Sequence, residues 1–418
     1  MELKPGYKQT EVGMIPEDWE AVTIGDVATF SGGSQPPRAT FKFAPTEGYI
    51  RLIQIRDYKT DAYASYIPEL LARKRCTAKD IMIGRYGPPI FQILRGIEGA
   101  YNVALLKATP SQRIDYEFFF NILKQDKLFN LIDSLSRRTS GQTGVEMPAL
   151  KGFWLPLPPL PEQRSIATAL SDIDKLLQSL DQLIAKKRDI KQATMQQLLT
   201  GKTRLPGFGE GRGYKQTEIG VIPDDWVSCQ VSKVTVTHKQ GYYTKDKYVE
   251  DGIRLVRITD LYNPRIDYGT MPMLRISEKD FEQYKVVKDD FLIARSGAIG
   301  RYGIVENDTN AIFGSYIIRF NFEREELLNR FFGYLFETQM IWKQLLSITQ
   351  GSSNININAG NIKELTVPLP TLPEQAAIAT ILTDMDTEII ALEQRRDKTR
   401  ALKQGMMQEL LTGKTRLI

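Results

Sequence analysis

Two segments of the chain carry a long, narrow stripe of apolar residues flanked by polar ones. In the first segment the stripe consists of Ile166, Leu170, Ile173, Leu177, Leu180 and Ile184, at alternating steps of four and three residues. In the second it consists of Ile378, Leu382, Met385, Ile389 and Leu392, is interrupted by Arg396, and resumes around Leu402, Met406 and Leu410. Such steps are typical of the a and d positions of a coiled coil. The pattern predicts two long helices, each with a narrow apolar seam.

The residues at the ends of each segment indicate where the helices begin and end. Pro161 and Pro373 suit a first helical turn, and Gly201 and Gly413 suit the left-handed residue just after a last turn. A continuous helix over 161–200 would reach roughly 60 Å at about 1.5 Å per residue. We expect antiparallel pairing, because a pseudo-twofold relation between two halves would point the helices in opposite directions. The alternative is that each helix covers its own domain.

The regions before the helices read as mixed α and β structure. Short β-rich runs at 49–55 and 253–258 are followed by turn-rich stretches, and aromatic-rich helical patterns close the regions at 116–135 and 325–346. The expected fold class is therefore α+β. It comprises two similar mixed α/β domains separated by two long antiparallel coiled-coil helices, with a pseudo-twofold internal repeat.

The chain contains the same sequence blocks twice. GYKQTEVGMIPEDW at 6–19 returns as GYKQTEIGVIPDDW at 213–226, with 11 of 14 positions identical. PLPPLPEQRSIATALSDID at 156–174 returns as PLPTLPEQAAIATILTDMD at 368–386, and LLTGKTRL closes each copy at 198–205 and 410–417. The regions between the blocks keep only faint echoes, such as IRLIQIRD from Ile50 and IRLVRITD from Ile253, or KDIMIGRYG from Lys79 and DDFLIARSG from Asp289. This contrast suggests two equivalent docking surfaces that hold two different reading heads.

Composition narrows the class of protein only a little. The formal net charge is +5, with 55 basic against 50 acidic residues, which permits a polyanionic partner without requiring one. Two cysteines and one histidine fit a reducing compartment and argue against a disulfide framework or a Cys/His metal site. The N-terminus lacks an apolar signal region and no run of 18 apolar residues occurs, so we expect a cytoplasmic protein without membrane contact.

Several short sequences resemble catalytic motifs but lack residues that those motifs require. Gly201-Lys202-Thr203 and its second copy end like a phosphate-binding loop, but Gln196 and Gln408 stand where an earlier glycine is needed, and a helix precedes them where a strand is needed. Tyr86-Gly87-Pro88-Pro89 lacks both the polar first residue and the final aromatic of the amino-methyltransferase motif, and no glycine-rich loop for S-adenosylmethionine accompanies it. The one Glu-x-Lys string, at 2–4, lies at the terminus. We therefore expect no catalytic residues, no cofactor and no metal.

The order of the blocks carries a family resemblance over essentially the full length. A short shared block, a variable region, a long helix opened by LPEQ at 160–163 and closed by LLTGKTRL, and then the same again at 372–375, resembles the specificity subunit of Type I restriction-modification systems. A single LPEQ motif is weak evidence for this family, whereas two LPEQ motifs in register with flanking repeats are strong evidence. Arg396 departs from the pattern, because it replaces the apolar seam position equivalent to Ile184.

The resemblance implies a division of the chain and a set of partners. The segments are a first repeat block (1–20), target recognition domain 1 (21–155), spacer helix 1 (156–204), a linker (205–213), a second repeat block (214–226), target recognition domain 2 (227–367) and spacer helix 2 (368–418). Each recognition domain would read one half of a bipartite, asymmetric site in double-stranded DNA. Two methylation subunits, and restriction subunits bound through the methylase complex, would supply the chemistry. The alternatives are a self-contained DNA methyltransferase or nuclease with atypical motifs, and a coiled-coil scaffold without sequence preference.

Candidate DNA-contacting residues are polar or basic side chains in loops that flank the β-rich runs, since base edges and phosphates are bound mainly by such groups. The candidates are Ser34, Gln35, Arg38, Lys42, Arg85, Tyr86, Arg137, Arg138 and Gln142 in the first region, and His238, Lys239, Gln240, Tyr243, Lys245, Arg295, Ser296, Gln350, Ser352 and Asn354 in the second. The basic runs Lys186–Arg188 and Arg395–Arg396 on the helices would either contact phosphates or serve solubility and subunit contact, which adjacent Asp189 and Asp397 favour.

Overall fold

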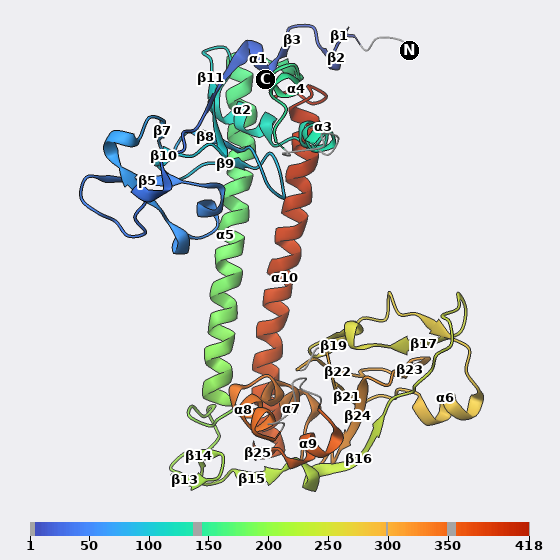
Figure 1. Cartoon of the computed structure of the whole chain (residues 1–418). Helices are drawn as coiled ribbons and strands as arrows, with labels where there is room; N and C mark the ends of the chain where they lie inside the picture. The colour runs from blue at the N-terminus through green and yellow to red at the C-terminus, as the bar shows by residue number, and fades with distance from the viewer. Residues whose placement is uncertain (1–4, 137–143, 298–299, 349–356, 418) are drawn as a thin grey trace. The chain divides into compact units, whose positions relative to one another are not determined.

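The computed structural model describes residues 5–136, 144–297, 300–348 and 357–417. These residues form two compact units. The first unit combines Met1–Asp181 with Gln394–Ile418, and the second comprises Gln182–Glu393. Two 39-residue helices, α5 (Leu160–Leu198) and α10 (Leu372–Leu410), contribute to both units (Figure 1). None of the helices in the described part of the chain is long and apolar enough to cross a membrane.

The first unit contains two four-stranded sheets. Its strands are β4 (Ala28–Gly32), β11 (Leu105–Pro110), β8 (Ile81–Gly84) and β9 (Ile93–Leu94) in one sheet, and β6 (Tyr66–Pro68), β5 (Tyr49–Ile53), β10 (Gly99–Tyr101) and β7 (Arg75–Cys76) in the other, each in spatial order. Two-stranded pairs join β1 (Tyr7–Thr10) to β2 (Gly13–Pro16) and β3 (Glu20–Thr23) to β12 (Trp154–Leu157). The helices are α1 (Ile24–Val27), α2 (Tyr116–Leu123), α3 (Asp126–Ser136) and α4 (Met147–Lys151).

The second unit repeats this order of elements with different loops. Its sheets are β16 (Thr235–Gln240), β24 (Ile317–Phe322), β21 (Phe291–Ala294) and β22 (Tyr302–Ile304), and β20 (Met273–Leu274), β17 (Ile253–Val256) and β23 (Ala311–Phe313). Pairs join β13 (Tyr214–Thr217) to β14 (Gly220–Pro223), β15 (Val227–Gln230) to β25 (Thr366–Leu369), and β18 (Leu261–Tyr262) to β19 (Arg265–Ile266). The helices are α6 (Glu278–Tyr284), α7 (Asn329–Phe336), α8 (Gln339–Ile348) and α9 (Ala359–Glu364). The expected class, two similar mixed α/β domains with two long helices, is confirmed.

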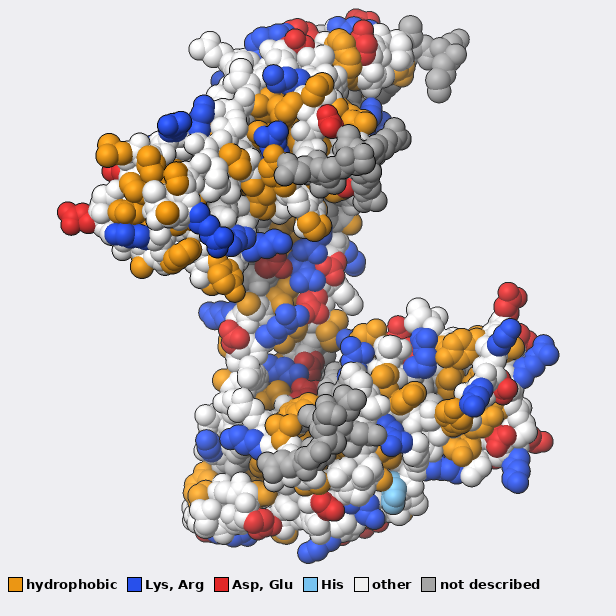
Figure 2. Space-filling view, viewed as in Figure 1, with side chains coloured by type: hydrophobic (Ala, Val, Ile, Leu, Met, Phe, Trp, Pro, Cys, Tyr) orange, Lys and Arg blue, Asp and Glu red, His pale blue; other side chains and the backbone are white. Residues whose placement is uncertain are grey.

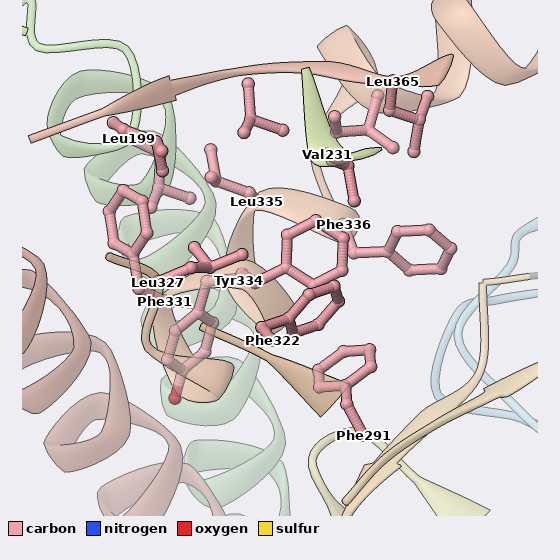
Figure 3. Close-up of a cluster of buried hydrophobic side chains, with 14 of the residues drawn as sticks. Leu199, Val231, Phe291, Phe322, Leu327, Phe331, Tyr334, Leu335, Phe336 and Leu365 are labelled. Carbon is pink, nitrogen blue, oxygen red and sulfur yellow. The ribbon is translucent and has the colours of Figure 1, made fainter. Parts of the chain in front are cut away.

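Each aromatic-rich pattern predicted as one helix is in fact two. In the first unit α2 ends at Leu123 and α3 begins at Asp126, and α2 buries almost its whole surface, including Phe118 and Phe119. In the second unit the aromatic residues of α7 pack against the sheet, and Phe331 and Phe336 share one buried cluster with Phe322 of β24 (Figure 3). The ring centroid of Phe332 lies 4.7 Å from that of Phe322.

The long helices pack antiparallel within each unit, as expected from the seams. In the first unit Ile166 and Leu170 of α5 share a buried cluster with Leu410 of α10. In the second unit Leu198 of α5 shares a cluster with Ile378 of α10. Both interpretations of the helices therefore hold in part, because each helix pairs with the other and also covers the cores of the units.

One detail of the predicted seam is wrong. Leu402 is 59% exposed, and the neighbouring Lys403 faces the seam instead, with its Nζ 2.6 Å from Asp174 Oδ1. The equivalent pair in the second unit joins Lys191 Nζ to Asp386 Oδ1 at 2.7 Å. A charged pair at the same place in both units takes the position that a strict apolar stripe would assign to a hydrophobic residue, because the two opposite charges neutralise each other there.

The repeated blocks meet in an ion cluster that closes each unit. In the first unit Arg416, from the last block, binds Glu162 (Nε–Oε1 2.7 Å) and Asp18 (Nη1–Oδ1 2.9 Å). Glu162 also accepts a hydrogen bond from Trp19 Nε1 at 3.0 Å. Glu162 is almost fully buried, so the guanidinium supplies the charge that its carboxylate needs away from water.

The second unit has the same ion cluster made from the other copies of the blocks. Arg204 binds Glu374 (Nε–Oε1 2.6 Å) and Asp225 (Nη1–Oδ1 2.8 Å), and Trp226 Nε1 donates to Glu374 Oε2 at 3.0 Å. The arginine in each cluster thus comes from the opposite repeat to the acidic residues and the tryptophan. Gly201, just before Arg204, has φ +68° and packs against Trp226, so a side chain there would be both strained and obstructed.

Candidate nucleic-acid interface

Five strand segments of the first unit converge where its two sheets meet. The turn 102–104 links β10 of one sheet to β11 of the other, and the backbone of this turn and of Tyr101, the last residue of β10, is bonded to three neighbouring segments. Asn102 N donates to Ile53 O at 3.1 Å, and Arg85 N donates to Ala104 O at 2.8 Å. Ser34 N donates to Tyr101 O at 3.1 Å. We name this place, comprising residues 33–34, 54, 85–86 and 102–104, the strand-end junction of the first unit.

The second unit builds the same junction from residues 241–242, 257, 295–296 and 314–316. Gly314 N donates to Val256 O at 2.9 Å, Arg295 N donates to Tyr316 O at 3.0 Å, and Tyr242 N donates to Phe313 O at 2.8 Å. Each bond has its counterpart in the first unit. Two heads with divergent sequences therefore present different side chains from one conserved backbone arrangement.

A glycine is required at the same place in both junctions. A Cβ on Gly33 would lie 1.9 Å from Asn102 O, and a Cβ on Gly241 would lie 2.2 Å from Gly314 O. Both contacts are with backbone, which cannot move aside. The glycine segment and the turn between the sheets therefore lie as close together as their backbones permit. This contact sets the position of the polar residues that follow each glycine.

Several predicted residues of the first unit lie at its junction and others do not. Ser34 and Gln35 follow β4 there, and Arg85 and Tyr86 follow β8, with the Arg85 guanidinium 5.2 Å from the Tyr86 ring centroid. Arg85 Nε is buried without a hydrogen-bond partner. Arg38 and Lys42 lie elsewhere. Arg38 begins the short 3₁₀ helix Arg38–Thr40, and Lys42 pairs with Tyr66 beside the second sheet, its Nζ 4.3 Å from the centre of the Tyr49 ring.

In the second unit, Arg295 and Ser296 follow β21 at the junction, and Gln240 Nε2 reaches Ser315 O at 3.3 Å. The interpretation of His238, Lys239 and Gln240 as loop residues is wrong, because all three belong to β16. His238 pairs with Phe320 on β24, its ring centroid 5.8 Å from that of Phe320, because the sheet extends further than the polar sequence suggested. Figure 2 shows this single histidine at the surface.

The remaining predicted residues fall into two groups. Tyr243 and Lys245 are exposed beyond β16. Arg137, Arg138, Gln142, Gln350, Ser352 and Asn354 lie outside the described residues. The residues that follow these last segments do reach the junctions, since Val145 N donates to Arg85 O at 3.1 Å and Ile357 N donates to Arg295 O at 2.8 Å.

Three junction residues were missed by the sequence reasoning. Gln54 directly follows β5 and Arg257 directly follows β17. Both lie beside the turn that links the two sheets of their unit. The echo between IRLIQIRD and IRLVRITD is a sequence signal for both, because Gln54 and Arg257 occupy the same position in it. Tyr316 lies in the turn 314–316 and is 63% exposed. No motif or echo in the sequence around Tyr316 marks it.

Charge at the two junctions is unequal. Asp57, three residues after Gln54, is 3% exposed, and burial raises the pKa of its carboxyl above the usual range. The equivalent Asp260 in the second unit is bound by the guanidinium of Arg257. Over both units, basic and acidic side chains are interspersed on the face that Figure 2 shows. On this face a polyanion would meet individual basic side chains rather than a broad surface of one sign.

The basic runs on the long helices pair with acidic residues across the seam. In the second unit Lys187 Nζ lies 2.7 Å from Glu388 Oε1, and Arg188 binds Glu393. In the first unit Arg396 Nη1 lies 3.6 Å from Asp181 Oδ1. These contacts join the two long helices, a use that neither interpretation of the runs included, and they partly neutralise the charges that phosphates would need.

Comparison with known proteins places the chain in a family. The family described as Type I restriction modification DNA specificity domain matches residues 16–187 and again 223–400. Because the two matches cover most of the chain, it belongs to that family. The two matched regions correspond to the two repeats that the sequence shows.

Curated relatives and solved structures agree with this placement. The specificity subunit of the Type I restriction enzyme MjaVIII of Methanocaldococcus jannaschii is 27% identical over 98% of this chain and 96% of its own length. The EcoBI specificity subunit of Escherichia coli is 23% identical over 95% of this chain and 85% of its own. The crystal structure of a Type I restriction-modification S subunit from M. genitalium covers 98% of both chains at 15% identity with a TM-score of 0.58, which shows a shared fold.

Proposed function

We propose that this chain is the DNA sequence-recognition subunit of a Type I restriction-modification complex. Residues 21–155 and 227–367 act as the two target recognition domains, and each reads one half of a bipartite, asymmetric site in double-stranded DNA. The observation that carries this proposal is the pair of strand-end junctions. The same backbone arrangement occurs twice but displays different polar side chains, as two heads that read different half-sites require.

The chain itself contributes recognition and no chemistry. Among the described residues, no group of three or more His, Cys, Asp or Glu side chains could hold a metal ion. The strings that imitate a phosphate loop lie just after α5 and α10, where the residues of GKTR build the ion clusters instead. In this proposal methyl transfer and cleavage belong to partner subunits in the cytoplasm, with two methylation subunits bound directly and restriction subunits bound through them.

The repeated hairpins support docking of two copies of one partner. Gln9 and Glu11 on the first hairpin, and their equivalents Gln216 and Glu218 on the second, are exposed and identical. The two glutamines donate to the carbonyl of the adjacent residue, Gln9 to Thr10 O at 3.4 Å and Gln216 to Thr217 O at 3.1 Å, whereas Glu218 also accepts from Ser228 Oγ at 2.7 Å. Exposed residues kept identical in two halves that diverge elsewhere indicate one partner surface, met twice.

The decisive experiment exchanges residues 21–155 for the matching region of a relative with a different site. The hybrid is produced with the methylation subunit, and the methylated sequences are mapped across a genome. One half of the recognised site should change while the other half and the spacing stay the same. If both halves change, or if the wild-type complex methylates no bipartite site, the two-head proposal is wrong.

A further inference from the structure

Arg257 and Gln54 occupy the same place in the two heads. Each follows the last residue of its strand, and the carbonyl just before it accepts the junction bond, from Gly314 N to Val256 O or from Asn102 N to Ile53 O. Three residues further along the chain each head has a buried aspartate, Asp260 or Asp57. Asp260 Oδ2 accepts a hydrogen bond from Arg257 N at 2.8 Å, and Asp57 Oδ2 accepts one from Gln54 N at 2.9 Å. The backbone is alike and only the side chain differs.

Asp260 holds the Arg257 side chain in a fixed direction. Its carboxylate accepts from Arg257 Nε at 3.1 Å and from Nη2 at 2.8 Å, while Thr270 O lies 3.4 Å from Nη2. Asp260 is 2% exposed, whereas the Arg257 side chain is 35% exposed. The Nε–Nη2 edge of the guanidinium is therefore anchored in the protein, and among the described residues no group accepts a hydrogen bond from Nη1. The second bond of Nη2, to Thr270 O, is long, and a closer acceptor on DNA would replace it.

The first head shows that the fold does not require the arginine. There Asp57 keeps its backbone bond to Gln54 N, but among the described residues no group donates a hydrogen bond to Asp57 Oδ1, and Arg56 Nε lies 3.9 Å from it. The Gln54 amide Nε2 lies 3.3 Å from Ser65 Oγ. The same loop forms with glutamine in place of arginine, so the loop conformation does not by itself require the guanidinium of Arg257.

We propose that this position is a specificity-determining contact in both heads, with Arg257 reading a guanine in the second half-site and Gln54 reading an adenine in the first. The inference rests on the proposed function. Arginine presents two parallel donors that match guanine O6 and N7, and glutamine presents a donor and an acceptor that match adenine N6 and N7. An arginine anchored by a carboxylate loses little side-chain freedom on binding, so its bidentate contact discriminates well.

The test maps methylated sequences for the wild-type complex and for Arg257→Gln. The variant should lose preference for a guanine at one position of the second half by roughly 5- to 100-fold, the range of one bidentate base contact. The first half should be unchanged. Asp260→Asn should keep the same preferred base but lower methylation at the site, because Asp260 positions the arginine without touching DNA.

Matched variants separate recognition from folding. Arg275→Gln removes an exposed arginine of the same head away from the junction and should leave the recognised sequence intact. Gln54→Arg should shift one position of the first half from adenine toward guanine. The inference is overturned if Arg257→Gln lowers the melting temperature yet leaves every recognised base unchanged, which would make Arg257 purely structural. A wild-type complex that methylates no bipartite site would instead refute the proposed function.

Discussion

Replacement of Arg416 by alanine should loosen the first unit far more than its place near the end of the chain suggests. Arg416 connects the last repeat block to Glu162 and Asp18 of the first repeat. Without the guanidinium, the Glu162 carboxylate stays buried and keeps its bonds from Trp19 Nε1 and Leu417 N, but it loses its compensating charge. A negative charge left alone in the interior is the costly outcome.

The magnitude follows from the exposure of the three groups. Removing one partner of a buried ion pair costs about 3–5 kcal/mol. The Arg416 side chain is 24% exposed, so solvent reaches part of the cluster and we expect the lower end, about 3 kcal/mol. The Asp18 side chain is 53% exposed and adds at most about 1 kcal/mol. For a unit of roughly 200 residues, about 3 kcal/mol lowers the melting temperature by about 6–12 °C.

Calorimetry of the full chain, with hydrogen exchange to locate the change, measures this effect. Exchange should rise in the first hairpin and the last turns of α10, and remain as in the wild type around Arg204. Lys414→Ala is the matched control, because its side chain is 66% exposed on the same tail. Adding Glu162→Gln to Arg416→Ala should recover part of the loss. An Arg416→Ala protein within about 0.5 kcal/mol of the control would refute the reasoning.

Three further outcomes are expected. The purified chain without partner subunits should transfer no methyl group from S-adenosylmethionine to DNA, and labelled transfer by the isolated chain would contradict the assignment. A fragment of residues 1–206 should form a dimer, because it contains one head, one long helix and Arg204, which can take the place of Arg416 in a second copy. The Arg204→Ala variant of this fragment should be monomeric. Sedimentation of both fragments checks this prediction. The guanidinium of Arg416 lowers the pKa of Asp18, and that of Arg204 lowers the pKa of Asp225. Their stabilising contributions are therefore present above the ordinary carboxyl pKa and lost as the pH falls through the lowered values, so acid-unfolding curves of Arg416→Ala should lack the Asp18 part.

The sequence by itself determined the repeated architecture and the long helices. The seam from Ile166 to Ile184 depends on local spacing, so helical periodicity alone predicts it. The family resemblance likewise rests on the order of blocks, which is a property of the chain. Both signals are local or repetitive, and neither needs knowledge of which distant residues meet.

Only the tertiary structure decided which residues act together. The junction brings Gln54 beside Asn102, and Arg257 beside Gly314, through backbone bonds between segments far apart in sequence. The spacing of apolar residues carries no information about such pairings. Likewise His238 looked like a loop residue because its neighbours are polar, yet its strand pairs with β24.

The same reason explains the ion clusters. The sequence shows that GKTR, LPEQ and DW occur twice, but not that the arginine of one repeat serves the glutamate and tryptophan of the other. That exchange exists because the long helices pack antiparallel, so that each unit contains the start of one helix and the end of the other. Repetition along the chain determined which residues are equivalent, and the packing of the helices determined which residues are adjacent.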